Sequence, residues 1–170
     1  AIIHFLEEAF PNPALFPKPV WEKAQVIELC EIINSGIHPL QNLKVLQRLS
    51  TQFGADSDGK NTWVHYWIER GFAGLEKKLE QVSGLYSFGD QLTTADLYLV
   101  PQTYTAKRFN FDYSVFPLIS KISKIEKSYI ILHDCIEDNK DGLQMIQKYF
   151  GNEMMISVLW MLAPKVAVLD

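Results

Sequence analysis

The sequence predicts an all-α fold, a bundle of helices around one core. Apolar residues recur at helical spacing in two long stretches, residues 20–49 and 64–82, as expected for helices that each bury one face. A third stretch, residues 92–101, opens with the residue pattern of a helix cap. A chain of 170 residues is long enough for such a helical domain to bury a core of its own.

The composition is that of an ordinary globular protein. Hydrophobic residues make up 48% of the chain and charged residues 21%, which excludes an intrinsically disordered protein and a membrane-spanning one. The 16 Lys and Arg residues are dispersed among 20 acidic residues, and no basic patch suited to a phosphate backbone is evident. We therefore expect neither nucleic acid nor a membrane as a partner.

Cysteine usage and metal-ligand spacing exclude further classes. Two cysteines are too few for the disulfide framework of a small secreted domain, so we expect a reducing, cytoplasmic location. Cys30 lies on the apolar stripe of a predicted helix and is interpreted as a buried thiol, with a Cys–His nucleophilic pair as the alternative. No metal site is expected, because the metal-ligating residue types lack finger or HExxH spacing: Cys30, His38, His65, His133, Cys135 and Glu137.

The chain divides into four predicted segments. Residues 1–10 are an amphipathic run that we interpret as the last helix of a domain beginning before this sequence. Residues 11–19 contain four prolines, which lock φ and remove backbone donors, and they predict an extended linker. The helical domain follows over residues 20–128. Residues 129–170 are rich in methionine, and no role is assigned to them. The apolar run that they contain is too short to cross a membrane.

Within the helical domain, glycine and proline predict where helices end. The first long helix is expected to break near residues 36–39, where a glycine and a proline interrupt the apolar pattern. Residues 54–61 are polar and contain two glycines, so they predict a loop, and residues 84–91 predict a turn-rich connector. A last helix is expected over residues 116–125.

Thr93 and Asp96 have the spacing of a capping box. The Thr93 side chain can accept a hydrogen bond from the Asp96 N–H, while the Asp96 carboxylate reaches back to the Thr93 N–H. The residues that follow are apolar on nearly all sides, which predicts a helix buried in the core with its polar start satisfied internally.

Several motifs resemble one known family. Residues 89–97, Gly-Asp-Gln-Leu-Thr-Thr-Ala-Asp-Leu, resemble the signature of the C-terminal domain of glutathione transferases. Four further pieces have the order and spacing of the zeta class of these enzymes, also called the maleylacetoacetate isomerases: residues 1–8, 36–43, 70–76 and 96–109. The resemblance covers about residues 1–127.

The resemblance implies a glutathione-transferase C-terminal helical bundle from a two-domain subunit that is usually a homodimer. In this family a thioredoxin-like N-terminal domain binds glutathione and activates its thiol from a Ser-Ser-Cys motif, which does not occur in this sequence. The thiolate adds to the cis double bond of maleylacetoacetate, a dicarboxylate of tyrosine and phenylalanine catabolism, and rotation and elimination give fumarylacetoacetate. We therefore expect glutathione as cofactor, and we expect the chain to be inactive alone.

The resemblance also implies roles for individual residues. Arg108 matches an arginine that holds a substrate carboxylate, a role that suits its planar fork of donors. His38 lies where the family has a glutathione-contacting Gln, and Asn42, Leu43 and Lys44 match a contacting Asn-Leu-Ser whose last residue is changed. For His38 a structural role is the alternative, and for Arg108 a solvated helix end.

A different class of function stays open from the sequence alone. Helical domains of this kind serve as docking modules for other proteins when the catalytic half is lost. The chain could therefore be a non-catalytic interaction module rather than part of an isomerase.

Overall fold

The computed structural model describes residues 2–9, 11, 12 and 14–124 of the chain. Residues 129–170, to which no role is assigned, lie outside the described residues. Residues Phe16–Lys124 form one compact unit, and the stretch up to Leu15 belongs to a second unit that is described by itself. No helix in the described part of the chain is long and apolar enough to cross a membrane.

The N-terminal stretch contains the predicted helix. Helix α1 spans Ile2–Ala9. The Glu7 carboxylate accepts hydrogen bonds from the backbone N–H of Leu15, at 3.0 Å to Oε2 and 3.2 Å to Oε1. This contact brings Leu15 back to the last turn of the helix.

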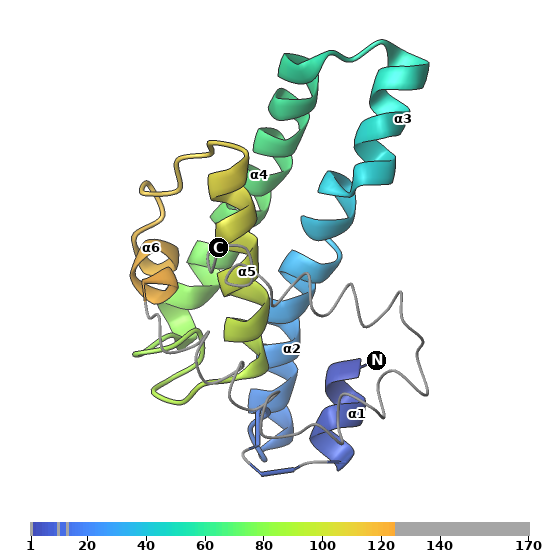
Figure 1. Cartoon of the computed structure of the whole chain (residues 1–170). Helices are drawn as coiled ribbons and strands as arrows, with labels where there is room; N and C mark the ends of the chain where they lie inside the picture. Colours follow the sequence, from blue (N-terminus) through green and yellow to red (C-terminus); the bar gives the residue numbers. More distant parts are fainter. Residues whose placement is uncertain (1, 10, 13, 125–170) are drawn as a thin grey trace, which may run out of the picture. The chain divides into compact units, whose positions relative to one another are not determined.

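The predicted break in the first long helix is confirmed. Helix α2 spans Val20–Asn34, a 3₁₀ turn η1 spans His38–Gln41, and helix α3 spans Leu43–Phe53. Helix α3 ends at Gly54, whose φ of 68° is a left-handed conformation that glycine adopts without strain. In Figure 1 these three elements follow one another, and α4 runs back beside α3.

The loop predicted over residues 54–61 is wrong for most of its length. Helix α4 spans Ser57–Val82, so only residues 54–56 connect it to α3. Asp56 is its N-cap, and the Asp56 Oδ1 atom accepts a hydrogen bond from the Gly59 N–H at 2.8 Å. The first turns of α4 are exposed and polar, which made them look like a loop in the sequence.

Helix α5, Thr94–Arg108, begins at the predicted capping box. The Thr93 N–H donates to Asp96 Oδ2 at 2.8 Å, and the reciprocal arrangement of the box is present. The Asp96 Oδ1 atom also accepts from the Ser87 N–H at 2.8 Å, which anchors the connector 84–91 to the helix start. Asp96 has no exposed surface, so the helix start is buried as predicted.

The core lies where α2, α4, α5 and the last helix, α6 (Pro117–Ser123), meet. Helix α5 packs against α2 and α6, and α4 packs against the same two helices. The Glu76 carboxylate, on α4, accepts hydrogen bonds from the backbone N–H groups of Leu118 and Ile119 at the start of α6. Apart from Thr94, the largest fully buried side chains of the described residues are apolar. They come from all four helices and from Ile37: Val26, Leu29, Val64, Ile68, Phe72, Leu75, Leu79, Leu99, Ile119 and Ile122.

Candidate functional site

The segment of residues 38–44 carries four of the five residues that the resemblance singled out. It is fixed from two directions. The Trp63 indole N–H, on α4, donates to the Leu40 carbonyl oxygen at 2.8 Å. The Gln41 side chain, only 8% exposed, exchanges amide hydrogen bonds with Gln102 of α5. Because 3₁₀ turns are short and hold weakly by themselves, these outside bonds define where the segment lies.

His38 opens η1 as an exposed residue, yet its ring has lost part of its water shell. This desolvation lowers the pKa of His38 below its ordinary value of 6.5. At neutral pH the imidazole is therefore uncharged, with one ring nitrogen able to donate and the other able to accept a hydrogen bond. Such a group can replace the amide of a Gln, which likewise has a donating and an accepting end.

Asn42 has a structural role that the sequence reasoning missed. It is the N-cap of α3, and its Oδ1 atom accepts a hydrogen bond from the Lys44 N–H at 3.0 Å. The signal was present in the sequence, because an Asn directly before an amphipathic stretch is a common helix start. Leu43 and Lys44 follow on the exposed surface, and 68% of Leu43 is accessible to solvent.

Arg108 is the last residue of α5 and is exposed. The next residue, Phe109, offers its carbonyl oxygen to His65 Nε2 of α4 at 2.6 Å. The His65 ring also meets Phe111 edge to face, with centroids 5.3 Å apart. His65 therefore fixes the end of the helix that carries Arg108, a role that nothing in its local sequence indicated.

The two parts of the predicted site meet the same short stretch of α4. Trp63 binds the backbone of the segment 38–44, and His65, two residues later, binds the backbone that follows Arg108. Both predicted parts of the site therefore contact α4. A hydrogen-bonding edge at His38 and a guanidinium at Arg108 suit a ligand with polar and anionic groups.

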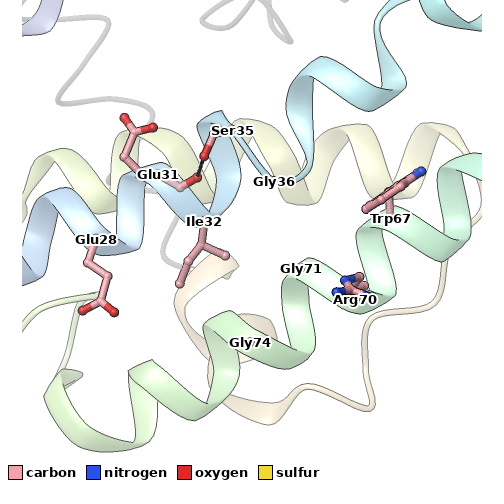
Figure 2. A pocket seen from close by; sticks show the side chains of 9 residues that line it. All are labelled: Glu28, Glu31, Ile32, Ser35, Gly36, Trp67, Arg70, Gly71 and Gly74. Carbon is pink, nitrogen blue, oxygen red and sulfur yellow. Dashed lines mark hydrogen bonds between the residues drawn. The ribbon is translucent and has the colours of Figure 1, made fainter.

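An open pocket of about 440 Å³ lies elsewhere, between α2 and α4 (Figure 2). None of the five predicted site residues lines it. Two glutamates line it. Glu28 forms an ion pair with Lys78 at 2.7 Å, and the Glu31 carboxylate accepts hydrogen bonds from the Asn34 side-chain amide. The lining residues are Glu28, Glu31, Ile32, Ser35, Gly36, Trp67, Arg70, Gly71 and Gly74.

Cys30 is buried as predicted, with 4% of its surface exposed. Burial is the main cause that raises the pKa of its thiol to about 12, with the charges of Glu31 and Asp96 adding to the effect. Its burial and this raised pKa both argue against Cys30 as a nucleophile at neutral pH, and they favour the interpretation as a buried thiol. Among residues 2–9, 11, 12 and 14–124, no three metal-ligating side chains come together.

Comparison with known proteins indicates the family to which this chain belongs. The chain is 42% identical to a probable maleylacetoacetate isomerase of Vibrio cholerae over 123 residues, which are 72% of this chain and 57% of that protein. A glutathione S-transferase from Legionella pneumophila superimposes with a TM-score of 0.74 at 37% identity, covering 78% of this chain and 72% of that one. No family model matches the sequence.

Two further solved structures narrow the class. A maleylpyruvate isomerase, described as a bacterial glutathione S-transferase of the zeta class, matches with a TM-score of 0.71 at 33% identity, covering 96% of this chain and 68% of that one. A maleylacetoacetate isomerase from Anaeromyxobacter dehalogenans, solved with glutathione in its active site, matches with a TM-score of 0.67 at 39% identity, covering 71% of this chain and 55% of that one.

The chain therefore belongs to the glutathione S-transferases, and within them to the zeta class. It spans about half the length of the curated relatives that it matches. The predicted all-α fold is confirmed, since every regular element in the described part of the chain is a helix.

Proposed function

We propose that this chain is the helical domain of a glutathione-dependent cis–trans isomerase that converts maleylacetoacetate to fumarylacetoacetate and also acts as a glutathione transferase. The observation that carries the proposal is the similarity of this chain to zeta-class isomerases, one of them solved with glutathione in its active site. In this proposal the subunit is cytoplasmic and forms a homodimer, and an N-terminal domain supplies the groups that activate glutathione.

The proposed reaction is nucleophilic catalysis by the thiol of glutathione. The thiolate adds to one carbon of the cis double bond, and the electron pair moves into the conjugated carbonyl group as an enolate. The remaining single bond rotates, the electron pair returns, and the thiolate leaves to give the trans isomer. No net proton or electron is consumed. The helical domain contributes position and charge rather than covalent chemistry.

Arg108 is proposed to bind a carboxylate of the dianionic substrate. Its guanidinium stays protonated and offers paired donors that match the two oxygens of a carboxylate. Lying directly before the Phe109 carbonyl that His65 holds, it can present these donors from a fixed helix end. The exposed position leaves room for a ligand to approach.

The segment 38–44 is proposed to bind glutathione. Neutral His38 would offer one donor and one acceptor to the peptide groups of the tripeptide, and Leu43 an exposed apolar surface. The Asn42 amide and the Lys44 side chain complete the proposed set. The cap formed by Asn42 fixes the direction in which these two residues leave the turn.

The first test is the coding sequence before Ala1. The roughly 70 to 80 codons that a small domain requires should encode a thioredoxin-like fold with a Ser-Ser-Cys or equivalent motif. If they do not, the catalytic proposal fails and a non-catalytic docking module becomes the better account.

The second test is kinetic and uses the full-length subunit. Arg108→Ala should lower kcat/KM for the dicarboxylate about 10- to 100-fold, the range expected for lost hydrogen bonds to a charged group, and leave the KM for glutathione nearly unchanged. Lys107→Ala removes the neighbouring positive charge and is the matched control, with a much smaller expected effect. Equal losses for both substrates in Arg108→Ala would contradict a carboxylate contact.

The isolated chain provides a third test. It should bind glutathione too weakly to measure by calorimetry, because the proposed contacts of the γ-glutamyl and thiol groups lie in the N-terminal domain. Tight binding by the 170-residue chain alone would contradict this division of roles.

A further inference from the structure

Two buried glutamines join the turn η1 to helix α5. The Gln41 Nε2 atom donates to Gln102 Oε1 at 2.7 Å, and Gln102 Nε2 returns a longer bond to Gln41 Oε1 at 3.4 Å. The two residues are 61 positions apart in the sequence. Their exposures are 8% and 3%, so water competes little for either amide.

The glutamine pair lies between two parts of the proposed site. Gln41 directly precedes Asn42 and lies three residues after His38, within the proposed glutathione-binding segment. Gln102 lies on α5, the helix that ends at Arg108. The amide pair is therefore a direct side-chain connection between the proposed glutathione-binding turn and the proposed substrate-binding helix.

Directional bonds accomplish something here that apolar packing does not. The hydrophobic effect is non-directional, whereas a 2.7 Å amide bond fixes both separation and orientation. The Trp63 N–H of a second helix, α4, donates to the carbonyl of the neighbouring residue Leu40. Two adjacent residues of η1, Leu40 and Gln41, are thus held by two different helices, and together these bonds fix where the short turn lies.

We infer that Gln41 and Gln102 are positioning residues that set the place of the glutathione-binding turn relative to the substrate-binding helix. The inference rests on the proposed function for its consequence in catalysis, but the positioning itself is a property of this chain. Neither glutamine need touch a ligand. Loss of the pair should displace the turn and so weaken glutathione binding.

Methionine variants separate positioning from stability. Met has nearly the length and volume of Gln but no hydrogen-bonding amide. Gln102→Met alone leaves the Gln41 amide buried without its partner, and it should lower the melting temperature. The double variant Gln41→Met, Gln102→Met removes both polar groups and should recover most of that loss, because replacing both partners by apolar groups of similar shape is nearly neutral.

The decisive readout in the 170-residue chain is hydrogen exchange at the Leu40 and Asn42 amides, which donate within η1 to Ile37 and Pro39. In the double variant these amides should exchange about fivefold faster than in wild type, the factor that corresponds to the net worth of one hydrogen bond. In the full-length subunit the KM for glutathione should rise by about the same factor. Gln52→Met, an exposed change on α3, is the matched control and should alter neither.

Wild-type exchange at Leu40 and Asn42 in the double variant would overturn the inference, as would an unchanged KM for glutathione in an active subunit. If the wild-type subunit neither binds glutathione nor isomerises the dicarboxylate, the proposed function fails, and hydrogen exchange still decides whether the pair positions the turn.

Discussion

The side chain of Ile37 packs directly onto the backbone of Gly71, so that a β-carbon at residue 71 would overlap Ile37 Cγ1 and Cδ1. Ile37 is fully buried and directly precedes η1, and Gly71 lies in the middle of α4. The missing side chain therefore allows the chain to pass close to α4 just before the predicted site. Glycine here serves close packing rather than backbone flexibility.

Gly71→Ala should destabilise the protein. The added methyl group must displace the fully buried side chain of Ile37, and overpacking of this kind costs about 1–3 kcal/mol of unfolding free energy. Gly74→Ala, three residues along the same helix, meets no atom within 4 Å and is the matched control. It should stabilise the chain by about 0.5–1 kcal/mol, because alanine favours a helix more than glycine does.

Urea unfolding of both variants measures this difference. Opposite signs for the two alanines are the expected result, and equal effects would show that Ile37 adjusts without cost. Amide exchange at Leu40, measured on the same samples, reports whether the strain spreads into η1.

Asp96→Ala should cost about 3 kcal/mol of unfolding free energy. The change removes the acceptors of two buried N–H groups, those of Ser87 and Thr93, and each unsatisfied buried donor costs about 1–3 kcal/mol. Asp90→Ala is the control, because Asp90 accepts one comparable bond from the Leu85 N–H but is exposed to water. Its cost should be about 1 kcal/mol or less. Similar losses in the two variants, measured by thermal unfolding, would contradict this account.

The sequence predicted the helices well where one face is apolar. Periodicity identified α2, α4 and α6 because burial imposes the helical spacing on the sequence. It failed at the start of α4, because Ser57–Asn61 form an exposed polar helix end with the composition of a loop. The available signal was Asp56, a residue type that often caps a helix start, but the glycines at positions 54 and 59 made the stretch resemble a loop.

The connections around the candidate site could not be predicted from the sequence. Gln41 and Gln102 are uncharged polar residues 61 positions apart, and nothing local to either shows that it is buried or paired. His65 is similar, because its partner is a backbone carbonyl 44 positions away. Such bonds depend on the packing of three helices, which periodicity does not encode. The motif resemblance predicts which residues contact a ligand, but not how they are held.

Glu76→Gln should destabilise α6. The two carboxylate oxygens of Glu76 accept from the Leu118 N–H at 2.7 Å and the Ile119 N–H at 3.1 Å, and the negative charge lies at a helix start. A glutamine keeps one acceptor but turns an NH₂ group toward the other donor, so we expect a loss of about 1.5–3 kcal/mol. Glu80→Gln, an exposed change one turn later, should have an effect within about 0.5 kcal/mol.

Hydrogen exchange localises this effect. The Leu118 and Ile119 amides should lose protection in Glu76→Gln while amides in the middle of α4 keep theirs until global unfolding. Uniform loss of protection would instead indicate that Glu76 supports the whole core.

His38 should make stability fall as the solution becomes acidic. Its pKa in the folded chain is lowered by desolvation, so the unfolded chain takes up a proton at a higher pH than the folded chain does. Unfolding is therefore favoured as pH falls below the ordinary His value of 6.5, while above that value His38 is neutral in both states and contributes nothing. His38→Gln removes this titration and should flatten the dependence of unfolding free energy on pH below 6.5, measured by urea unfolding at a series of pH values.

Wild type and the His38→Gln variant share every carboxylate, so acid effects from those groups cancel in the comparison. If the unfolding free energies of wild type and variant instead depend on pH in the same way, the His38 ring is protonated as easily in the folded chain as in the unfolded one, which would contradict this account. In the full-length subunit the same substitution should leave glutathione binding at pH 7.5 nearly unchanged, because Gln offers the donor and acceptor that neutral His38 provides.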